Sequence, residues 1–150
     1  MKMILDLDTG IDDALALSCV LGTPAIDLLG VVCSYGNVEV GQAVKNTLKV
    51  LSLLEREDIP VIKGASAPMK KDLFIVNPLS RIVHGTDGIG DTGLRDVDLP
   101  VLNISAEDFL HDMALKYGAD LLIVTEGPLT NLASTVRRNK VTGTLFRLWV

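Results

Sequence analysis

Met3-Ile-Leu-Asp-Leu-Asp-Thr-Gly-Ile-Asp-Asp-Ala14 opens the chain and decides its fold. Apolar residues interleave with the first two acidic residues as in a buried strand, Gly10 marks a turn, and apolar residues then recur at helical spacing. This pattern predicts a strand over residues 2–8, a tight loop and a helix over residues 11–22. Four carboxylates lie at the junction between strand and helix: Asp6, Asp8, Asp12 and Asp13.

The four carboxylates lie close enough together to need a physical reason. Like charges repel and burial removes their hydration, so a fold keeps such a group at its surface or around a cation. Asp6 and Asp8 share one face of a strand, and Asp8 lies at the carboxyl end, where open α/β sheets bind ligands. Asp12 and Asp13 diverge by about 100° in a helical turn, so we expect them to hold different objects.

A divalent cation is one explanation for this acidic junction. Calcium and magnesium are hard ions that prefer oxygen ligands, which carboxylates supply. The alternative is that the acids only cap and solvate the start of the helix, with no ligand. Capping accounts for one or two of these residues, but it does not account for Asp6 and Asp8 on the strand side.

The rest of the chain alternates between strand and helix patterns. Strands alternating with helices predict parallel βαβ units, and hence one α/β domain over residues 1–150 with a Rossmann-like parallel sheet and flanking helices. Residues 64–104 hold three of the six Pro and five of the thirteen Gly and read as a long loop with short pieces of structure, a kind of segment that is usually functional. Thr130 and Asn131 are expected to serve as cap and turn residues. Further strands are predicted over 27–34, 59–63 and 120–124, and further helices over 38–57, 106–116 and 129–138.

Composition bounds the class of protein. The 150 residues are 48% apolar, which suits a core-rich α/β protein, and Cys19 and Cys33 lie in apolar segments as expected of buried thiols. The net charge of −5 and the lack of a basic cluster argue against nucleic acid as a partner. No apolar run is long enough to span a membrane, and the first residues lead into a strand, so we expect a cytoplasmic protein.

Three motifs lie where a predicted strand passes into a helix, and such junctions meet at one edge of a sheet. They are the opening acidic run, the turn Tyr35-Gly-Asn37 and the segment Val124-Thr-Glu-Gly-Pro-Leu-Thr-Asn131. Together with the loop His84-Gly-Thr-Asp-Gly-Ile-Gly90, they make the chain resemble the inosine-uridine preferring nucleoside hydrolases over about residues 2–138. Members of that family use water to cleave the N-glycosidic bond of ribonucleosides.

The resemblance implies a calcium site with a water-activating base. Asp8 would ligate calcium and act as the general base, and Asp13 would ligate calcium through both of its carboxylate oxygens. The backbone carbonyl of Glu126 falls where the family supplies a main-chain ligand. Asp6 matches an inner carboxylate that orients the loop from behind.

The resemblance also implies how a ribonucleoside substrate is held. Asp12 would take a ribose hydroxyl, and Asn37 matches a position near the sugar and the attacking water. His84 lies in a matching His-Gly loop, where a neutral imidazole would contact the base or the sugar; the alternative is a surface histidine beside a glycine turn.

The chain departs from the family at its end. Family members are longer, with further site residues in their second half, and residues 139–150 form an atypical tail that lacks the family's glycines. We expect a truncated chain, with a reading frame shifted or a gene shortened near residue 140. A non-catalytic remnant that self-associates is therefore an alternative, and a homo-oligomer is expected. A haloacid dehalogenase-like phosphatase is a minor alternative, although Gly10 occupies the fifth position of that family's motif.

Overall fold

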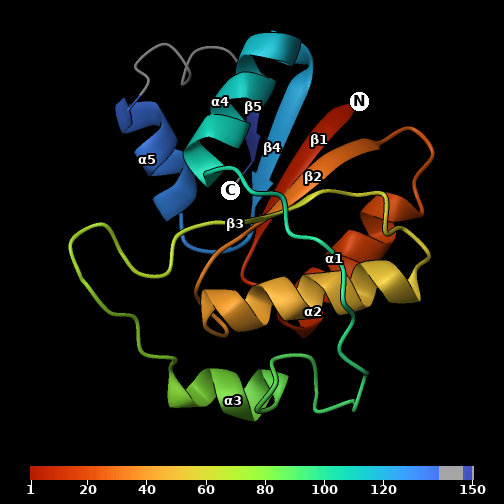
Figure 1. Cartoon of the computed structure of the whole chain (residues 1–150), viewed down its shortest axis with the longest axis vertical. Helices are drawn as coiled ribbons and strands as arrows, with labels where there is room; N and C mark the ends of the chain where they lie inside the picture. Colours follow the sequence, from red (N-terminus) through yellow and green to blue (C-terminus); the bar gives the residue numbers. More distant parts are fainter. Residues whose placement is uncertain (139–146, 150) are drawn as a thin grey trace.

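A single parallel sheet forms the centre of the molecule (Figure 1). The structure is a computed structural model that describes residues 1–138 and 147–149. Within these residues the strand order is β3-β2-β1-β4-β5, and every pair of neighbours is parallel. The strands are β1 (Lys2–Leu7), β2 (Asp27–Cys33), β3 (Val61–Lys63), β4 (Leu121–Thr125) and β5 (Arg147–Trp149).

Helices cover both faces of this sheet, as the βαβ pattern predicts. In Figure 1, α1 and α2 lie on one face and α4 and α5 on the other, while α3 lies apart from the sheet. No helix among the described residues has the length and apolar character that a membrane span needs. The helices are α1 (Ile11–Leu21), α2 (Val40–Leu53), α3 (Pro78–His84), α4 (Ala106–Tyr117) and α5 (Thr130–Arg138), with a 3-10 turn η1 at Gly118–Asp120.

Strand β1 contributes to the core on both faces of the sheet. Leu5 and Leu7 belong to the apolar cluster under α1 and α2, whereas Ile4 belongs to the cluster under α4 and α5. Each of these side chains is at most 1% exposed, and burying one contributes about 1.5–3 kcal/mol to folding. The loop after β1, which carries the acidic run, therefore leaves from a strand that is packed on both of its faces.

The predicted fold class is confirmed, and the differences are local. α2 is shorter than the predicted helix over 38–57, because Leu54 ends it and Glu55 turns into the left-handed region with φ 56°. α3 is a short helix inside the long loop over residues 64–104, where the sequence predicts short pieces of structure. Cys19 is exposed, so its prediction as a buried thiol is wrong, whereas Cys33 is buried.

The predictions on domain extent and on the tail have separate outcomes. The single domain over residues 1–150 stays a prediction. Of the atypical tail over 139–150, only 147–149 lie within the described residues, and they form β5 beside β4.

Candidate active site

The site lies at the carboxyl edge of the sheet, where three neighbouring strands end. Asp8 follows β1, Asn37 follows β2 and Glu126 follows β4. The Glu126 N–H donates to the Asp6 carbonyl at 3.0 Å, which holds the end of β4 against the end of β1. The topology therefore gathers residues more than a hundred positions apart in the sequence, at the place where parallel sheets bind ligands.

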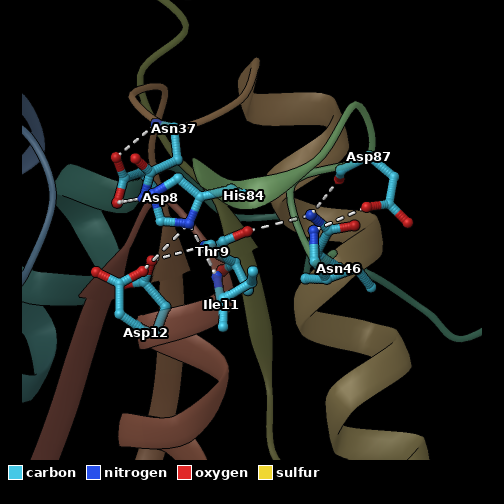
Figure 2. A network of polar contacts seen from close by, with 11 residues as sticks. Asp8, Thr9, Ile11, Asp12, Asn37, Asn46, His84 and Asp87 are labelled. Atoms are coloured by element: carbon cyan, nitrogen blue, oxygen red, sulfur yellow. Dashed lines mark hydrogen bonds and ion pairs between the residues drawn. The ribbon is translucent and has the colours of Figure 1, made fainter. Parts of the chain in front are cut away.

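Asp8 is buried and held by the loop after β2. Its Oδ2 accepts a hydrogen bond from the Asn37 backbone N–H at 2.7 Å, and its Oδ1 lies 3.4 Å from the Asn37 side-chain Nδ2 (Figure 2). Gly36 and Gly127 pack directly against the carboxylate, and a Cβ at Gly36 would overlap Oδ2 of Asp8. The carboxylate is thus fixed in one position before any substrate arrives.

Asp13 faces the same interior from the first turn of α1. Its Oδ2 accepts from the Gly10 N–H at 2.7 Å, while its Oδ1 is buried without a hydrogen-bond partner. Burial, together with the charges of Asp8 and Asp12, raises the pKa of Asp13 to about 7. Burial is also the main cause of the raised pKa of Asp8.

Two buried carboxylates that repel each other, one with an unpartnered oxygen, fit a hard divalent cation. Within residues 1–138 and 147–149, no group of three His, Cys, Asp or Glu residues is placed to hold a metal ion. Further ligands would have to come from backbone carbonyls and water, and Glu126 stands next to Gly127, which packs on Asp8. The donor set therefore fits a hard divalent cation in chemistry and leaves several coordination positions to water.

Asp12 and Asp13 point to different surroundings, as helical spacing requires. The Asp12 side chain is 70% exposed, and its Oδ1 lies 3.6 Å from Nδ1 of His84 (Figure 2). The same Nδ1 accepts a hydrogen bond from the Ile11 backbone N–H at 3.2 Å. His84 therefore lies against the start of α1, beside the acidic cluster, and is not a detached surface residue.

Asp6 supports the site from behind, on the α5 side of the sheet. Its Oδ1 accepts from Nδ2 of Asn131 at 2.9 Å, and Oδ1 of Asn131 accepts from the Ala65 N–H at 2.7 Å. Asn131 is 1% exposed and joins the end of β1 to the loop after β3. A simple capping role for Asn131 is therefore wrong, and no local pattern indicates a bond between residues so far apart in the sequence.

Asp6→Asn is expected to flatten the pH dependence of stability in metal-free buffer. Burial is the main cause that raises the pKa of Asp6 from 3.8 to about 7. Because the folded state binds this proton more tightly than the unfolded chain, the stability it provides is complete below about pH 4 and is lost as the pH rises through about 7. A shift of about three pKa units corresponds to roughly 4 kcal/mol.

Urea unfolding of both proteins at pH 5 and pH 8.5 measures this difference. The asparagine can keep the bond from Asn131, because its own Oδ1 accepts in place of the carboxylate. Equal losses of unfolding free energy in the wild type and the variant would contradict the assignment.

Comparison with known proteins identifies the family. The sequence pattern of the inosine-uridine preferring nucleoside hydrolases matches residues 3–147. Uridine nucleosidase 1 of Arabidopsis thaliana is 35% identical over 138 residues, which cover 92% of this chain and 40% of that protein. The pyrimidine-specific ribonucleoside hydrolase RihA of Escherichia coli is 33% identical, over 89% of this chain and 42% of its own length.

Solved structures agree with the sequence comparison. The purine-preferring ribonucleoside hydrolase from Gardnerella vaginalis superposes with a TM-score of 0.95 at 42% identity, over 97% of this chain and 46% of that one. The chain therefore belongs to the inosine-uridine preferring nucleoside hydrolase family. It spans less than half the length of these relatives.

Proposed function

We propose that this site hydrolyses the N-glycosidic bond of ribonucleosides to free base and ribose, with calcium as its cofactor. The observation that carries the proposal is the pairing of Asp8 and Asp13, two buried carboxylates at the carboxyl edge of the sheet, beside a neutral amide donor. Family membership supports the reaction class, and the names of relatives point to uridine and purine ribonucleosides as the compounds to test.

Asp8 is the general base in this proposal. It accepts a proton from the attacking water, the water oxygen bonds to the anomeric carbon, and the base leaves with the electron pair of the glycosidic bond and takes up a proton. The bond from the Asn37 N–H holds Oδ2 of Asp8 in place. The other carboxylate oxygen is therefore already oriented to accept the proton from the water. Positioning therefore contributes more than basicity.

The substrate sugar is held by exposed polar groups on the outer side of the same loop. Asp12 accepts a hydrogen bond from a ribose hydroxyl, since its carboxylate is exposed and stands beside His84. Asn37 offers its side-chain amide next to Asp8, close to the sugar and the water. His84 contacts the base or the sugar. These roles use side chains that the fold already places on one edge of the sheet.

Calcium would be held by Asp8, Asp13 and the backbone carbonyl of Glu126. A bound ion would give the unpartnered Oδ1 of Asp13 a partner. The bond between Asp6 and Asn131 would keep the acidic loop from shifting. When bound, the ion supplies charge that polarises water and a fixed point for the sugar diol. With few protein ligands, binding is expected to be weak, because water completes the coordination.

Ribose release tests this proposal directly. The purified chain is incubated with inosine, uridine or p-nitrophenyl phosphate, with added calcium or with a chelator, and reducing sugar and phosphate are measured. We expect calcium-dependent ribose release and no phosphate release. The family match leaves the phosphatase alternative without support. Absence of ribose release from every nucleoside, with a folded and calcium-loaded chain, would overturn the proposal.

Self-association is a second property that we propose, and it remains the basis of the non-catalytic alternative. The support is a group of exposed apolar side chains on α3 and the segment before it, a surface that association would cover. Light scattering after size exclusion, at two concentrations, distinguishes a monomer from a homo-oligomer. The group consists of Leu73, Ile75, Leu79, Ile82 and Val83, each at least 58% exposed.

The biological setting is part of the same proposal. Cys19 and Cys33 are both free thiols, which suits the reducing cytoplasm. The reaction would place the protein in nucleoside catabolism and salvage, with a ribonucleoside and not a nucleic acid as its partner.

A further inference from the structure

Asn46 in α2 connects two loops that are distant in the sequence. It is fully buried, and its Nδ2 donates both to the Thr9 carbonyl at 3.1 Å and to the Asp87 carbonyl at 2.8 Å (Figure 2). Its Oδ1 accepts from the Gln42 side chain at 2.8 Å, so both donor hydrogens are directed at the two loops. An apolar side chain at this position would take the donor away from one buried carbonyl, that of Thr9, and one partly buried carbonyl, that of Asp87.

The loop that contains Asp87 is closed on itself and behaves as one unit. The Gly90 N–H donates to the His84 carbonyl at 2.7 Å, and the Asp91 carboxylate accepts from the Thr86 and Asp87 N–H groups. Because these bonds fix the loop internally, holding Asp87 also sets where His84 stands.

The loop packs against Asn46 so closely that there is no room for a side chain at Gly88. A Cβ at Gly88 would come within 2.5 Å of Cγ1 of Val38 and 3.0 Å of Nδ2 of Asn46, and the φ of +87° itself disfavours any other residue. The contact between the loop and Asn46 is therefore close, and any enlargement of the loop must break it.

The position of His84 fixes its chemical form. The Ile11 N–H donates to Nδ1 at 3.2 Å, so Nδ1 must carry the lone pair in the neutral ring, and the proton resides on Nε2. Nε2 is then a hydrogen-bond donor on the other side of the imidazole. If the loop moved away from α1, the ring would lose this bond and the stabilisation that the bond gives to the Nε2–H tautomer.

We propose that Asn46 is a positioning residue that clamps the His84 loop onto the acidic loop and thereby holds His84 as its Nε2–H tautomer. The clamp itself follows from the contacts above, and only its effect on catalysis rests on the proposed function. The hydrogen bonds of Asn46 go to Gln42, Thr9 and Asp87, and none of these is a metal ligand in the proposed function. Asn46 acts through the carbonyl of Thr9, the residue that directly follows Asp8, and through the loop that carries His84.

Thr47, the next residue of α2, offers a matched control. Its hydroxyl donates to the Ala43 carbonyl at 2.9 Å, so it accepts from the Thr9 hydroxyl, which lies 2.7 Å away. Thr47 thus supports the acidic loop from the same stretch of helix and has no bond to the His84 loop among the contacts described. Thr47→Val keeps the shape and removes the hydroxyl that supports Thr9. The same change removes the bond to the Ala43 carbonyl and the 3.3 Å contact with Sγ of Cys33, and it leaves the bonds of Asn46 to the two loops in place.

Nitrogen-15 NMR of the imidazoles tests the clamp without any activity. The chain has two histidines, so His111 serves as an internal reference. In the wild type we expect His84 to show a protonated Nε2 and an unprotonated Nδ1. Asn46→Ser should shift the His84 signals toward a mixture of tautomers and leave His111 unchanged, whereas Thr47→Val should leave both unchanged. Gly88→Ala changes the loop side of the same contact, because its Cβ would push the loop away from Val38 and Asn46. It should reproduce the effect of Asn46→Ser, and it serves as the second variant if Asn46→Ser folds poorly.

Kinetics test the catalytic consequence. Asn46→Ser and His84→Gln should each lower kcat/KM by at least about tenfold. The double variant should have the same kcat/KM as the less active of the two single variants, because both changes remove the same positioned group. The proposal is overturned if Asn46→Ser and Gly88→Ala leave the His84 spectrum as in the wild type, or if Thr47→Val changes it equally. A wild-type chain without ribose release would refute the proposed function, while the spectra would still decide the role of Asn46.

Discussion

Asp8→Asn is expected to lower kcat/KM for inosine and uridine by about 10³-fold, within the range that general-base catalysis contributes. The asparagine has the same size and can still accept the bond from the Asn37 N–H through its own oxygen. It cannot take a proton from water. The loss should therefore appear in the chemical step, measured as release of reducing sugar under saturating calcium.

A matched control separates this effect from a general loss of charge. Asp98 is exposed and distant in sequence from the motifs of the site, so Asp98→Asn removes one negative charge without touching the acidic loop. Its activity should equal that of the wild type. If Asp8→Asn keeps more than a tenth of the wild-type rate while calcium is bound, another group is the base.

Calcium is expected to stabilise the wild type and to leave Asp13→Asn unchanged. A ligand at one hundred times its dissociation constant adds about 2.7 kcal/mol, which for a domain of this size raises Tm by roughly 5–10 °C. Asp13→Asn removes a ligand and one of the buried charges, yet its oxygen can still accept from the Gly10 N–H. Differential scanning calorimetry with calcium and with chelator measures both proteins.

In the presence of chelator, we expect the opposite effect of Asp13→Asn on stability. In the metal-free wild type, burial and then the charge of Asp8 raise the pKa of Asp13, so the ionised form of Asp13 is disfavoured. Above about pH 7 the metal-free Asp13→Asn protein should therefore be at least as stable as the metal-free wild type. A variant that is less stable without calcium, or that gains the same Tm increase with it, would show that Asp13 does not hold the ion.

Patterns with a strong local signal could be read from the sequence. The alternation around β1 and the apolar stripe of α2 indicate buried elements directly. The acidic run marks the carboxyl edge of the sheet, because the loops that lead from a strand into a helix all lie at that edge of a parallel sheet. This is why Asp8, Asp13 and Asn37 could be placed together before the fold was known.

Features that depend on distant partners could not be read in this way. α3 buries none of its residues, so no apolar stripe reveals it. Asn131 and Asn46 look like ordinary polar positions in helices. Their importance comes from distant partners: Asn131 bonds to Asp6 of β1, 125 residues away along the chain, and Asn46 bonds to the loop at Asp87, 41 residues away. A buried polar side chain is visible only when its partners are known.

The central place of β1 has a consequence for how the molecule opens. β1 is bonded to β2 on one side and to β4 on the other, while β3 and β5 form the rims of the sheet. Partial unfolding begins where the fewest contacts must break, so we expect β3 and β5 to exchange their amide hydrogens first and β1 last. Asp8, which directly follows β1, thus stays attached to the slowest-exchanging strand.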